Sequence, residues 1–266
     1  MSKQRLDLML FERGLVESRE KAKTTIMSGC VYVNGQRADK PGQSYSEDCE
    51  IEVRRSGPEY VSRGGLKLEK ALNEFSVEPK DAICLDCGAS TGGFTDCLLK
   101  RGAKKVYAVD VGYGQLAWSI RNDERVVTME RTNIRYVTHE QIPDELDLCT
   151  IDVSFISLKL VLPVLRALLK DGGEVICLVK PQFEAGREKV GKKGVVRDPA
   201  VHLDVLDSFL ENADSADFSV LEMTFSPIRG PEGNIEYLAH LVTGRGSSAD
   251  IDTKKIVEAS HASLEK

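Results

Sequence analysis

From residue 66 onward, short apolar segments alternate along the chain with stretches of helical pattern. The segments with the length and residue content of strands are 82–86, 105–110, 125–129, 146–152, 174–180, 218–224 and 235–242. Strands that alternate with helices predict an α/β domain with a parallel-dominated sheet covered on both faces. Ligands bind such sheets at the carboxyl ends of the strands, so the residues there are the first functional candidates.

The composition is typical of a globular protein. Of the 266 residues, 41% are hydrophobic and 29% are charged, which excludes a disordered or fibrous chain. The longest apolar run, 146–156, is interrupted by Asp147 and Asp152 and is shorter than the roughly 20 residues of a membrane-spanning helix. Charged residues are interleaved from Lys3 onward without a signal-peptide pattern, so we expect a cytoplasmic protein with no membrane partner.

The cysteines and histidines do not form a metal-ligand pattern. Seven cysteines are scattered along the chain, an odd number that favours free thiols in a reducing compartment. Cys84 and Cys87 lie within a predicted strand, where residues three apart point to opposite faces, so we expect core thiols there rather than a metal or redox pair. The four histidines are isolated from one another in sequence. We therefore expect no metal.

The first 55 residues are predicted to form a small α+β domain. An apolar face over 6–11 ends at Gly14, and Ser18 is placed to cap a helix over 19–28 that Gly29 ends. The segment 30–33 leads into Asn34-Gly35, a strong hairpin signal, and 49–53 can add a further strand. A linker is predicted over 56–65, because 54–65 is rich in Gly and charge, and the polar tail 247–266 is assigned no function.

The small domain is mildly basic although the whole chain carries a net charge of -6. Residues 1–40 contain eight Lys or Arg against five Asp or Glu. The elements Arg5-Leu-Asp7, Ser18-Arg-Glu-Lys-Ala22, Ile26-Met-Ser-Gly29 and Val31-Tyr-Val-Asn-Gly35 resemble, in order, the RNA-binding module named after ribosomal protein S-four. The resemblance implies phosphate contacts from Arg5, Arg19, Lys21 and Lys23. Taken without it, these residues read as a solvated helical face.

A Gly-rich turn follows the first predicted strand of the larger domain, in Asp86-Cys-Gly-Ala-Ser-Thr-Gly-Gly-Phe94. It lacks the Lys of a phosphate-binding loop and the G-x-G-x-x-G spacing of a dinucleotide site. Asp110 ends the next strand, where a carboxylate suits ribose hydroxyls. The pair of acids around this turn looks like the S-adenosylmethionine site of Rossmann-like methyltransferases, although a tight turn with an incidental Asp is the alternative. The residues that we expect at the cofactor are Asp86, Gly88, Ser90, Gly92, Gly93, Phe94, Asp110, Val111, Asn133 and Asp152.

Charged residues precede or end several predicted strands and point to one polar pocket, because a charge at the end of an apolar strand is costly unless it is paired or catalytic. Lys67, Asp152, Lys180 and Glu236 resemble, in order and context, the Lys-Asp-Lys-Glu tetrad of FtsJ-like ribose 2′-O-methyltransferases. Together with the N-terminal module, the chain resembles the TlyA family of ribosomal RNA methyltransferases, historically called hemolysin-like. Each residue by itself would read as a surface ion pair.

The resemblance implies that Lys180 takes the proton of the ribose hydroxyl, that Asp152 and Glu236 orient Lys180, and that Lys67 positions or polarises the hydroxyl. Carboxylates favour a charged lysine, so the sequence leaves open whether Lys180 is a base or an orienting group. The loop 186–194 follows directly and is basic. We expect RNA contacts from Arg187, Lys189, Lys192 and Lys193, and from Arg63 in the linker; a mobile surface loop is the alternative.

The resemblance implies an S-adenosylmethionine-dependent enzyme that methylates ribose 2′-hydroxyls of ribosomal RNA, with the RNA or ribosomal subunits as partner. The sequence lacks the Asn/Asp-Pro-Pro-aromatic and Pro-Cys motifs of base methyltransferases. Two alternatives from other classes are a non-catalytic RNA-binding factor on a methyltransferase scaffold and the membrane-lysing protein that the older family name suggests. No insertion segment or pore-forming repeat supports the latter. The sequence indicates no oligomeric state.

Overall fold

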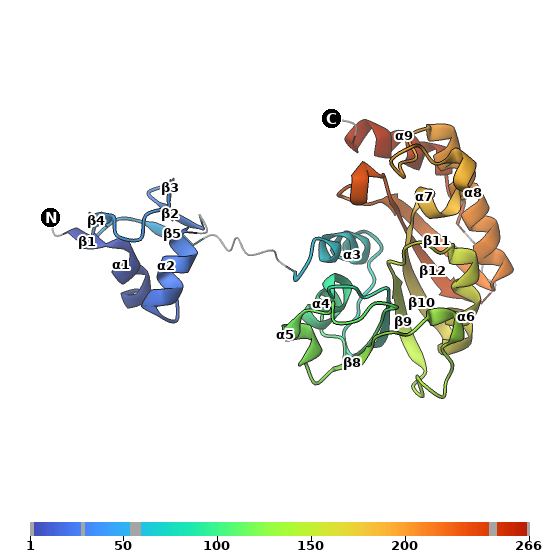
Figure 1. The fold of residues 1–266 in the computed structure, drawn as a ribbon, viewed down its shortest axis with the longest axis horizontal. Coiled ribbons are helices and arrows are strands. Elements are labelled where there is room, and N and C mark those ends of the chain that lie inside the picture. The colour runs from blue at the N-terminus through green and yellow to red at the C-terminus, as the bar shows by residue number, and fades with distance from the viewer. Residues whose placement is uncertain (1–2, 28–29, 54–59, 245–248, 265–266) are drawn as a thin grey trace. The chain divides into compact units, whose positions relative to one another are not determined.

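The structure is a computed structural model that describes residues 3–27, 30–53, 60–244 and 249–264. The chain divides into two compact units, Met1–Glu59 and Tyr60–Lys266 (Figure 1). Each unit has a hydrophobic core of its own.

The N-terminal unit packs helices against small antiparallel sheets. Leu6, Met9 and Ile26 of the helices meet Val31 and Val33 in its core. The helices are α1 (Leu6–Glu12) and α2 (Arg19–Met27), the strands β3 (Gln36–Ala38), β2 (Val31–Val33) and β5 (Ile51–Val53) form one sheet in that order, and β1 (Lys3–Arg5) pairs with β4 (Ser44–Ser46). The sequence did not predict β1 and β4, because β1 contains no apolar residue and β4 contains only Tyr45.

Local signals fix the ends of these elements. The Oγ of Ser18 accepts a hydrogen bond from the N–H of Lys21 at 3.1 Å, so the predicted helix cap is confirmed. Asn34 and Gly35 have φ of 49° and 77°, the left-handed pair required by the tight hairpin turn that joins β2 to β3. The predicted helix end at Ser28 and Gly29 lies outside the described residues.

The second unit is built on a seven-stranded sheet in the order β11-β12-β10-β9-β6-β7-β8. Its parallel strands are β6 (Ile83–Cys87), β7 (Lys105–Val109), β8 (Val126–Met129), β9 (Leu146–Ile151) and β10 (Leu169–Val179). β11 (Phe218–Phe225) and β12 (Tyr237–Thr243) complete it in antiparallel pairing. The predicted parallel-dominated α/β sheet is confirmed, and β10 begins five residues earlier than predicted, at Leu169 instead of 174.

Helices cover both faces of this sheet (Figure 1). Neighbouring residues of a strand point to opposite faces, so Cys84 packs with α3 and α4 while Leu85 packs with α6 and α8. One face carries α3 (Gly64–Glu74), α4 (Gly93–Lys100) and α5 (Trp118–Arg121), and the other carries α6 (Leu162–Leu168), α8 (Pro199–Ser215) and α9 (Thr253–Leu264). The shorter elements are α7 (Pro181–Glu184) and the 3₁₀ turns η1 (Ile134–Tyr136), η2 (Leu158–Leu160), η3 (Arg187–Lys189) and η4 (Pro231–Gly233).

The end of the predicted linker belongs to the second unit. Tyr60 is buried, and a Cβ on Gly65 would lie 2.2 Å from its ring, so glycine is required for this close approach. The N–H of Val61 donates to Asp96 of α4 at 2.8 Å. Near the other end of the chain, α9 packs on α8 and β11 through Val257. Residues 60–65 and α9 are therefore integral parts of the fold.

The antiparallel strand β12 matters for the site. Its first residue, Tyr237, pairs with Val179, the last residue of β10. Glu236 therefore lies beside Lys180, at the edge of the sheet where the parallel strands end.

Candidate active site

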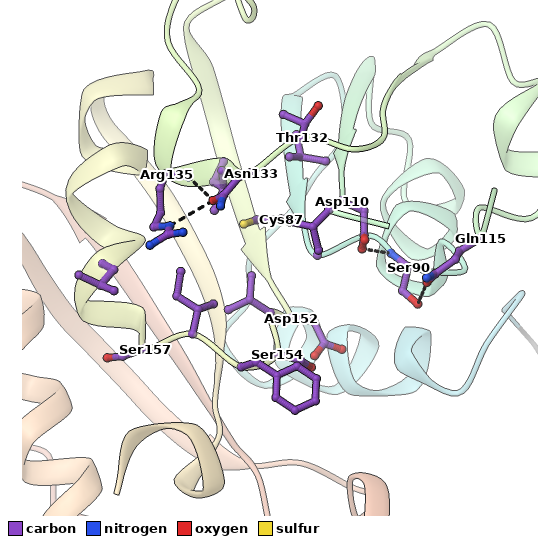
Figure 2. A pocket seen from close by; sticks show the side chains of 18 residues that line it. Cys87, Ser90, Asp110, Gln115, Thr132, Asn133, Arg135, Asp152, Ser154 and Ser157 are labelled. Carbon is purple, nitrogen blue, oxygen red and sulfur yellow. Dashed lines mark hydrogen bonds between the residues drawn. The ribbon is translucent and has the colours of Figure 1, made fainter. Parts of the chain in front are cut away.

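A cavity of about 610 Å³ opens at the carboxyl ends of β6, β7 and β9 (Figure 2). A site of this size accommodates a nucleoside-sized ligand. The predicted cofactor residues that line it are Gly88, Ser90, Asp110, Val111, Asn133 and Asp152.

Asp110 anchors one wall of this cavity. One carboxylate oxygen accepts the N–H of Ser90 at 2.8 Å, and the other accepts the N–H of Gly112 at 2.6 Å. A carboxylate has about four acceptor positions. Asp110 can therefore hold the two loops together and still accept hydrogen bonds from a ligand.

Gly88 allows the turn after β6 to approach the end of β9. A Cβ on Gly88 would lie 2.6 Å from the carbonyl oxygen of Asp152, and its φ is +89°. Any other residue would push the two strand ends apart or strain the backbone. The glycine therefore brings Asp152 to the wall of the cavity.

The structure places Asp86, which was predicted at the cofactor, behind the cavity wall. Asp86 is fully buried and absent from the cavity wall. One of its oxygens accepts both the N–H and the hydroxyl of Thr95, at 2.9 and 2.6 Å. Burial raises the pKa of Asp86 to about 7. Its carboxyl group fixes the Gly-rich turn onto α4 from behind the cavity.

Gly92, Gly93 and Phe94, also predicted at the cofactor, do not line the cavity either. A Cβ on Gly93 would lie 2.2 Å from the Oγ of Ser62, so this glycine lets α4 approach the start of α3. Gly92 has a φ of +94°, and Phe94 is buried in the core between α3, α4 and the sheet. These residues shape the turn by packing.

Sequence reasoning missed part of the cavity wall. The whole segment 153–157 lines it, together with Gln115, Thr132, Ile134, Arg135 and Leu160. Figure 2 shows Gln115 beside Ser90 and Arg135 beside Asn133. The sequence did carry a signal for this segment, because 153–157 directly follows the end of a predicted strand, where ligands of such sheets bind.

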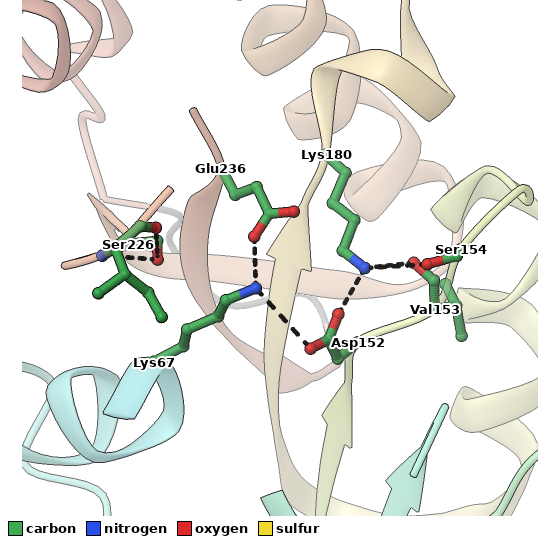
Figure 3. A network of polar contacts seen from close by, with 8 residues as sticks. Lys67, Asp152, Val153, Ser154, Lys180, Ser226 and Glu236 are labelled. Atoms are coloured by element: carbon green, nitrogen blue, oxygen red, sulfur yellow. Dashed lines mark hydrogen bonds and ion pairs between the residues drawn. The ribbon is translucent and has the colours of Figure 1, made fainter. Parts of the chain in front are cut away.

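The predicted tetrad is assembled in one chain of contacts (Figure 3). The Nζ of Lys67, from α3, lies 2.5 Å from a carboxylate oxygen of Glu236 and 4.0 Å from Asp152. The other oxygen of Asp152 lies 2.5 Å from the Nζ of Lys180. Asp152 thus stands between two lysines, which the sequence places 113 positions apart at 67 and 180.

Lys180 has three acceptors around its amino group. Besides Asp152, its Nζ donates to the carbonyl oxygen of Val153 at 2.8 Å and lies 3.4 Å from the Oγ of Ser154. Glu236 is fully buried, and its second oxygen has no hydrogen-bond partner among the described residues. A Cβ on Gly230 would lie 2.2 Å from that oxygen, so the loop before β12 closes tightly over it.

Two of the predicted RNA contacts in the N-terminal unit are tied to a buried carboxylate. Arg5 and Arg19 lie 3.0 and 3.1 Å from oxygens of Asp7. The Arg5 guanidinium, with help from Arg19, holds the pKa of Asp7 below its usual range. Each arginine side chain remains 47% exposed, so both can still meet a phosphate.

The remaining predicted RNA contacts lie on the surface of their own units. Lys21 and Lys23 project from α2, and Arg63 immediately precedes α3. The loop 187–193 exposes Arg187, Lys189, Lys192 and Lys193, of which Lys189 pairs with Asp204 at 2.9 Å.

All seven cysteines are buried. Burial raises the pKa of Cys87, which lines the cavity, well above its usual value, so it stays a neutral thiol. The described residues contain no group of three or more His, Cys, Asp or Glu that could hold a metal ion. Within the same residues, no helix is long and apolar enough to span a membrane.

Comparison with known families matches both units of the chain. Residues 60–243 match the model of the FtsJ-like methyltransferases, and residues 4–48 match that of the S4 domain. The first match contains all four tetrad residues.

Individual proteins match over nearly the whole chain. A Bacillus subtilis protein provisionally named rRNA methyltransferase YqxC is 54% identical over 99% of this chain and 96% of its own. The 16S/23S rRNA (cytidine-2′-O)-methyltransferase TlyA of Mycobacterium tuberculosis is 42% identical over 98% of this chain and 97% of its own. A solved Streptococcus thermophilus structure, described provisionally as a hemolysin, has a TM-score of 0.76 and 47% identity, covering 100% of this chain and 98% of that one.

Proposed function

This chain belongs to the TlyA family of FtsJ-like methyltransferases, and we propose that it transfers a methyl group from S-adenosylmethionine to a ribose 2′-hydroxyl of ribosomal RNA. The observation that carries the proposal is the chain of contacts Glu236–Lys67–Asp152–Lys180 at the edge of the cavity. Four charged side chains from separate elements meet there, one of them fully buried.

The cavity suits the cofactor. Its volume of about 610 Å³ fits a nucleoside with an amino-acid chain. Asp110 offers acceptors that would suit ribose hydroxyls, and Asp152 adds a carboxylate to the cavity wall that would suit a cationic group of the ligand. S-adenosylmethionine supplies a methyl group on a sulfonium ion, which leaves as a neutral thioether. Gly88, Ser90, Asp110 and Asn133 would hold it.

Lys180 is proposed to receive the proton of the 2′-hydroxyl. As the hydroxyl oxygen bonds to the methyl carbon, its proton passes to the lysine nitrogen, which requires a neutral amine. A neutral amine keeps two N–H donors, enough for Asp152 and the carbonyl of Val153. The longer contact, 3.4 Å to Ser154, can be given up or reversed, because the serine hydroxyl can itself donate.

Lys67 and Glu236 are proposed to set the electrostatics of the site. Asp152 lies near both Lys67 and Lys180. The positive charge of Lys67 therefore offsets part of the attraction between the Asp152 carboxylate and Lys180. Glu236 in turn holds Lys67 at 2.5 Å. Positioning of hydroxyl and methyl group supplies the rest of the rate.

The RNA substrate is proposed from the N-terminal unit and from the relatives. The unit matches the S4 domain and presents Arg5, Arg19, Lys21 and Lys23 at its surface. The M. tuberculosis relative is named for the 2′-hydroxyl of cytidines in 16S and 23S rRNA. Basic side chains that contact phosphates position an RNA without reading its sequence.

The test is transfer of label from radiolabelled S-adenosylmethionine to separated ribosomal subunits and rRNA from cells that lack the enzyme. We expect label at a discrete ribose, detected because 2′-O-methylation makes the adjacent phosphodiester resistant to alkali. Calorimetry measures cofactor binding in parallel. Absence of both label and cofactor binding would leave an RNA-binding protein on a methyltransferase scaffold.

A further inference from the structure

The segment 152–158 joins the end of β9 to η2 and forms much of the cavity wall. Its first residue is fixed twice, because the N–H of Asp152 donates to the carbonyl of Cys87 at 2.9 Å and its carboxylate pairs with Lys180. Lys180 also holds the next carbonyl, that of Val153. The start of the segment is therefore tied to the catalytic lysine.

The middle of the segment is strained. Phe155 has a φ of +64°, in the left-handed region that bulky residues avoid, and its side chain is 91% exposed. Such a conformation is unfavourable for a bulky residue and persists only where the surroundings fix it. The ring makes a tilted contact with Phe183, at 5.0 Å between centroids, but it is almost fully exposed, so the restraint is expected at the far end of the segment.

Glu184 supplies it. This residue ends α7, one helical turn after Lys180. One of its oxygens accepts the hydroxyl of Ser157 at 2.6 Å, and the other accepts the N–H of Leu158 at 2.9 Å. Ser157 is fixed from a second side, because its Oγ also accepts the N–H of Lys159 at 3.2 Å. The carboxyl group is mostly buried, which raises its pKa.

We propose that Glu184 is a positioning residue for methyl transfer: it locks the far end of the cavity wall 152–158 to the helix that begins at Lys180. Both ends of the wall are then held by the short segment 180–184: Lys180 holds the start of the wall, and Glu184 holds its end. A shift of the segment 180–184 would move the proposed proton acceptor, Lys180, and the cavity wall 152–158 together. This inference rests on the proposed function.

The test compares Glu184→Ala with Glu184→Gln. Alanine removes both contacts, and a misplacement of catalytic groups by about 1 Å costs about 10²-fold in kcat. Glutamine keeps an acceptor for Leu158 and can donate to the Oγ of Ser157, so we expect it to restore activity to within about 10-fold of wild type. We also expect the alanine variant to bind S-adenosylmethionine with a higher Kd, measured by calorimetry.

A readout independent of turnover follows the wall itself. Hydrogen exchange of the amides of 153–158, measured by mass spectrometry, should speed up in Glu184→Ala and less in Ser157→Ala, which keeps the Leu158 contact. The control is Asp147→Asn, at the opposite end of β9, whose carboxylate accepts the N–H of Ile83 at 2.7 Å. It should leave both kcat and exchange of the wall unchanged.

The outcomes separate the two proposals. Wild-type protein that methylates no RNA contradicts the proposed function, whatever the variants do. Unchanged exchange of 153–158 in folded Glu184→Ala overturns the positioning role, as does a kcat equal to that of wild type. Should Glu184→Ala not fold, Ser157→Ala carries the same test, with the same direction of change and a smaller size.

Discussion

Asp86 and Asp152 stand in similar sequence contexts, but the structure buries Asp86 and leaves Asp152 partly exposed on the cavity wall. Each follows an apolar run, and their strands β6 and β9 are neighbours in the sheet. Asp86 is fully buried with Thr95 as its hydrogen-bond donor, whereas Asp152 is 21% exposed on the cavity wall and lies between two lysines. The donors within reach of a carboxylate at a strand end thus decide whether it is buried in the fold, as Asp86 is, or lies on the cavity wall, where we propose a functional role for Asp152.

The largest expected effect is at the lysine that Asp152 holds. Lys180→Ala should lower kcat by about 10²–10⁴-fold, the range of a lost general base, with cofactor affinity retained. Lys180→Arg keeps a positive charge but cannot accept a proton, and we expect it to be equally inactive. Single-turnover label transfer measures both.

Arginine also separates the two roles that the sequence left open for Lys180. A Lys180→Arg variant with more than about one tenth of wild-type activity would show that the residue acts as an orienting cation. The acceptor of the proton would then have to be sought elsewhere in the site.

The next largest effect is expected for Gly230→Ala, which should lower kcat by about 10²-fold. The added Cβ would lie 2.2 Å from the Glu236 carboxylate and would displace it from Lys67. Steady-state kinetics on ribosomal subunits measures the loss. If the effect passes through Glu236, Gly230→Ala should add little to Glu236→Gln. Additive losses would contradict this route.

Asp110→Asn should act mainly on the cofactor. The amide nitrogen of asparagine would face the N–H of either Ser90 or Gly112, so one of the two bonds that hold these loops is lost. We expect the calorimetric Kd for S-adenosylmethionine to rise about 10-fold and kcat at saturation to change less. A large fall in kcat with an unchanged Kd would contradict the assignment of Asp110 to the cofactor.

Asp86→Asn should have the smallest effect on activity and a specific effect on stability. Because the pKa of Asp86 is raised from 3.8 to about 7, its stabilising contribution is complete below pH 3.8 and is lost as the pH rises through 7. One pKa unit corresponds to about 1.4 kcal/mol, so the stabilisation that is lost over this pH range is at most about 4 kcal/mol. Asparagine, which does not titrate, should remove that decline from the free energy of unfolding, measured by urea titration between pH 4 and 8.

The sequence predicted the sheet well because strands with continuous apolar runs and short loops are local features. It also pointed to Lys67, Asp152, Lys180 and Glu236 through motifs that resemble those of a known family, and the structure brings these four side chains together. It could not predict that Asp86 is buried behind the cavity wall, because the donors to its carboxylate, Thr95 at the start of α4 and Thr150 of β9, are brought to it by the fold. The wall 153–157 was missed for a similar reason, since its shape depends on Glu184, which lies beyond the next helix and strand.

The division of roles between the two aspartates is tested most directly by measuring methyl transfer and unfolding free energy on Asp86→Asn and Asp152→Asn side by side. We predict that Asp152→Asn loses at least about 10²-fold in label transfer, whereas Asp86→Asn stays within about 10-fold of wild type and alone flattens the pH dependence of unfolding between pH 4 and 7. Equal losses of activity in the two variants, with the same pH dependence of stability, would contradict the account.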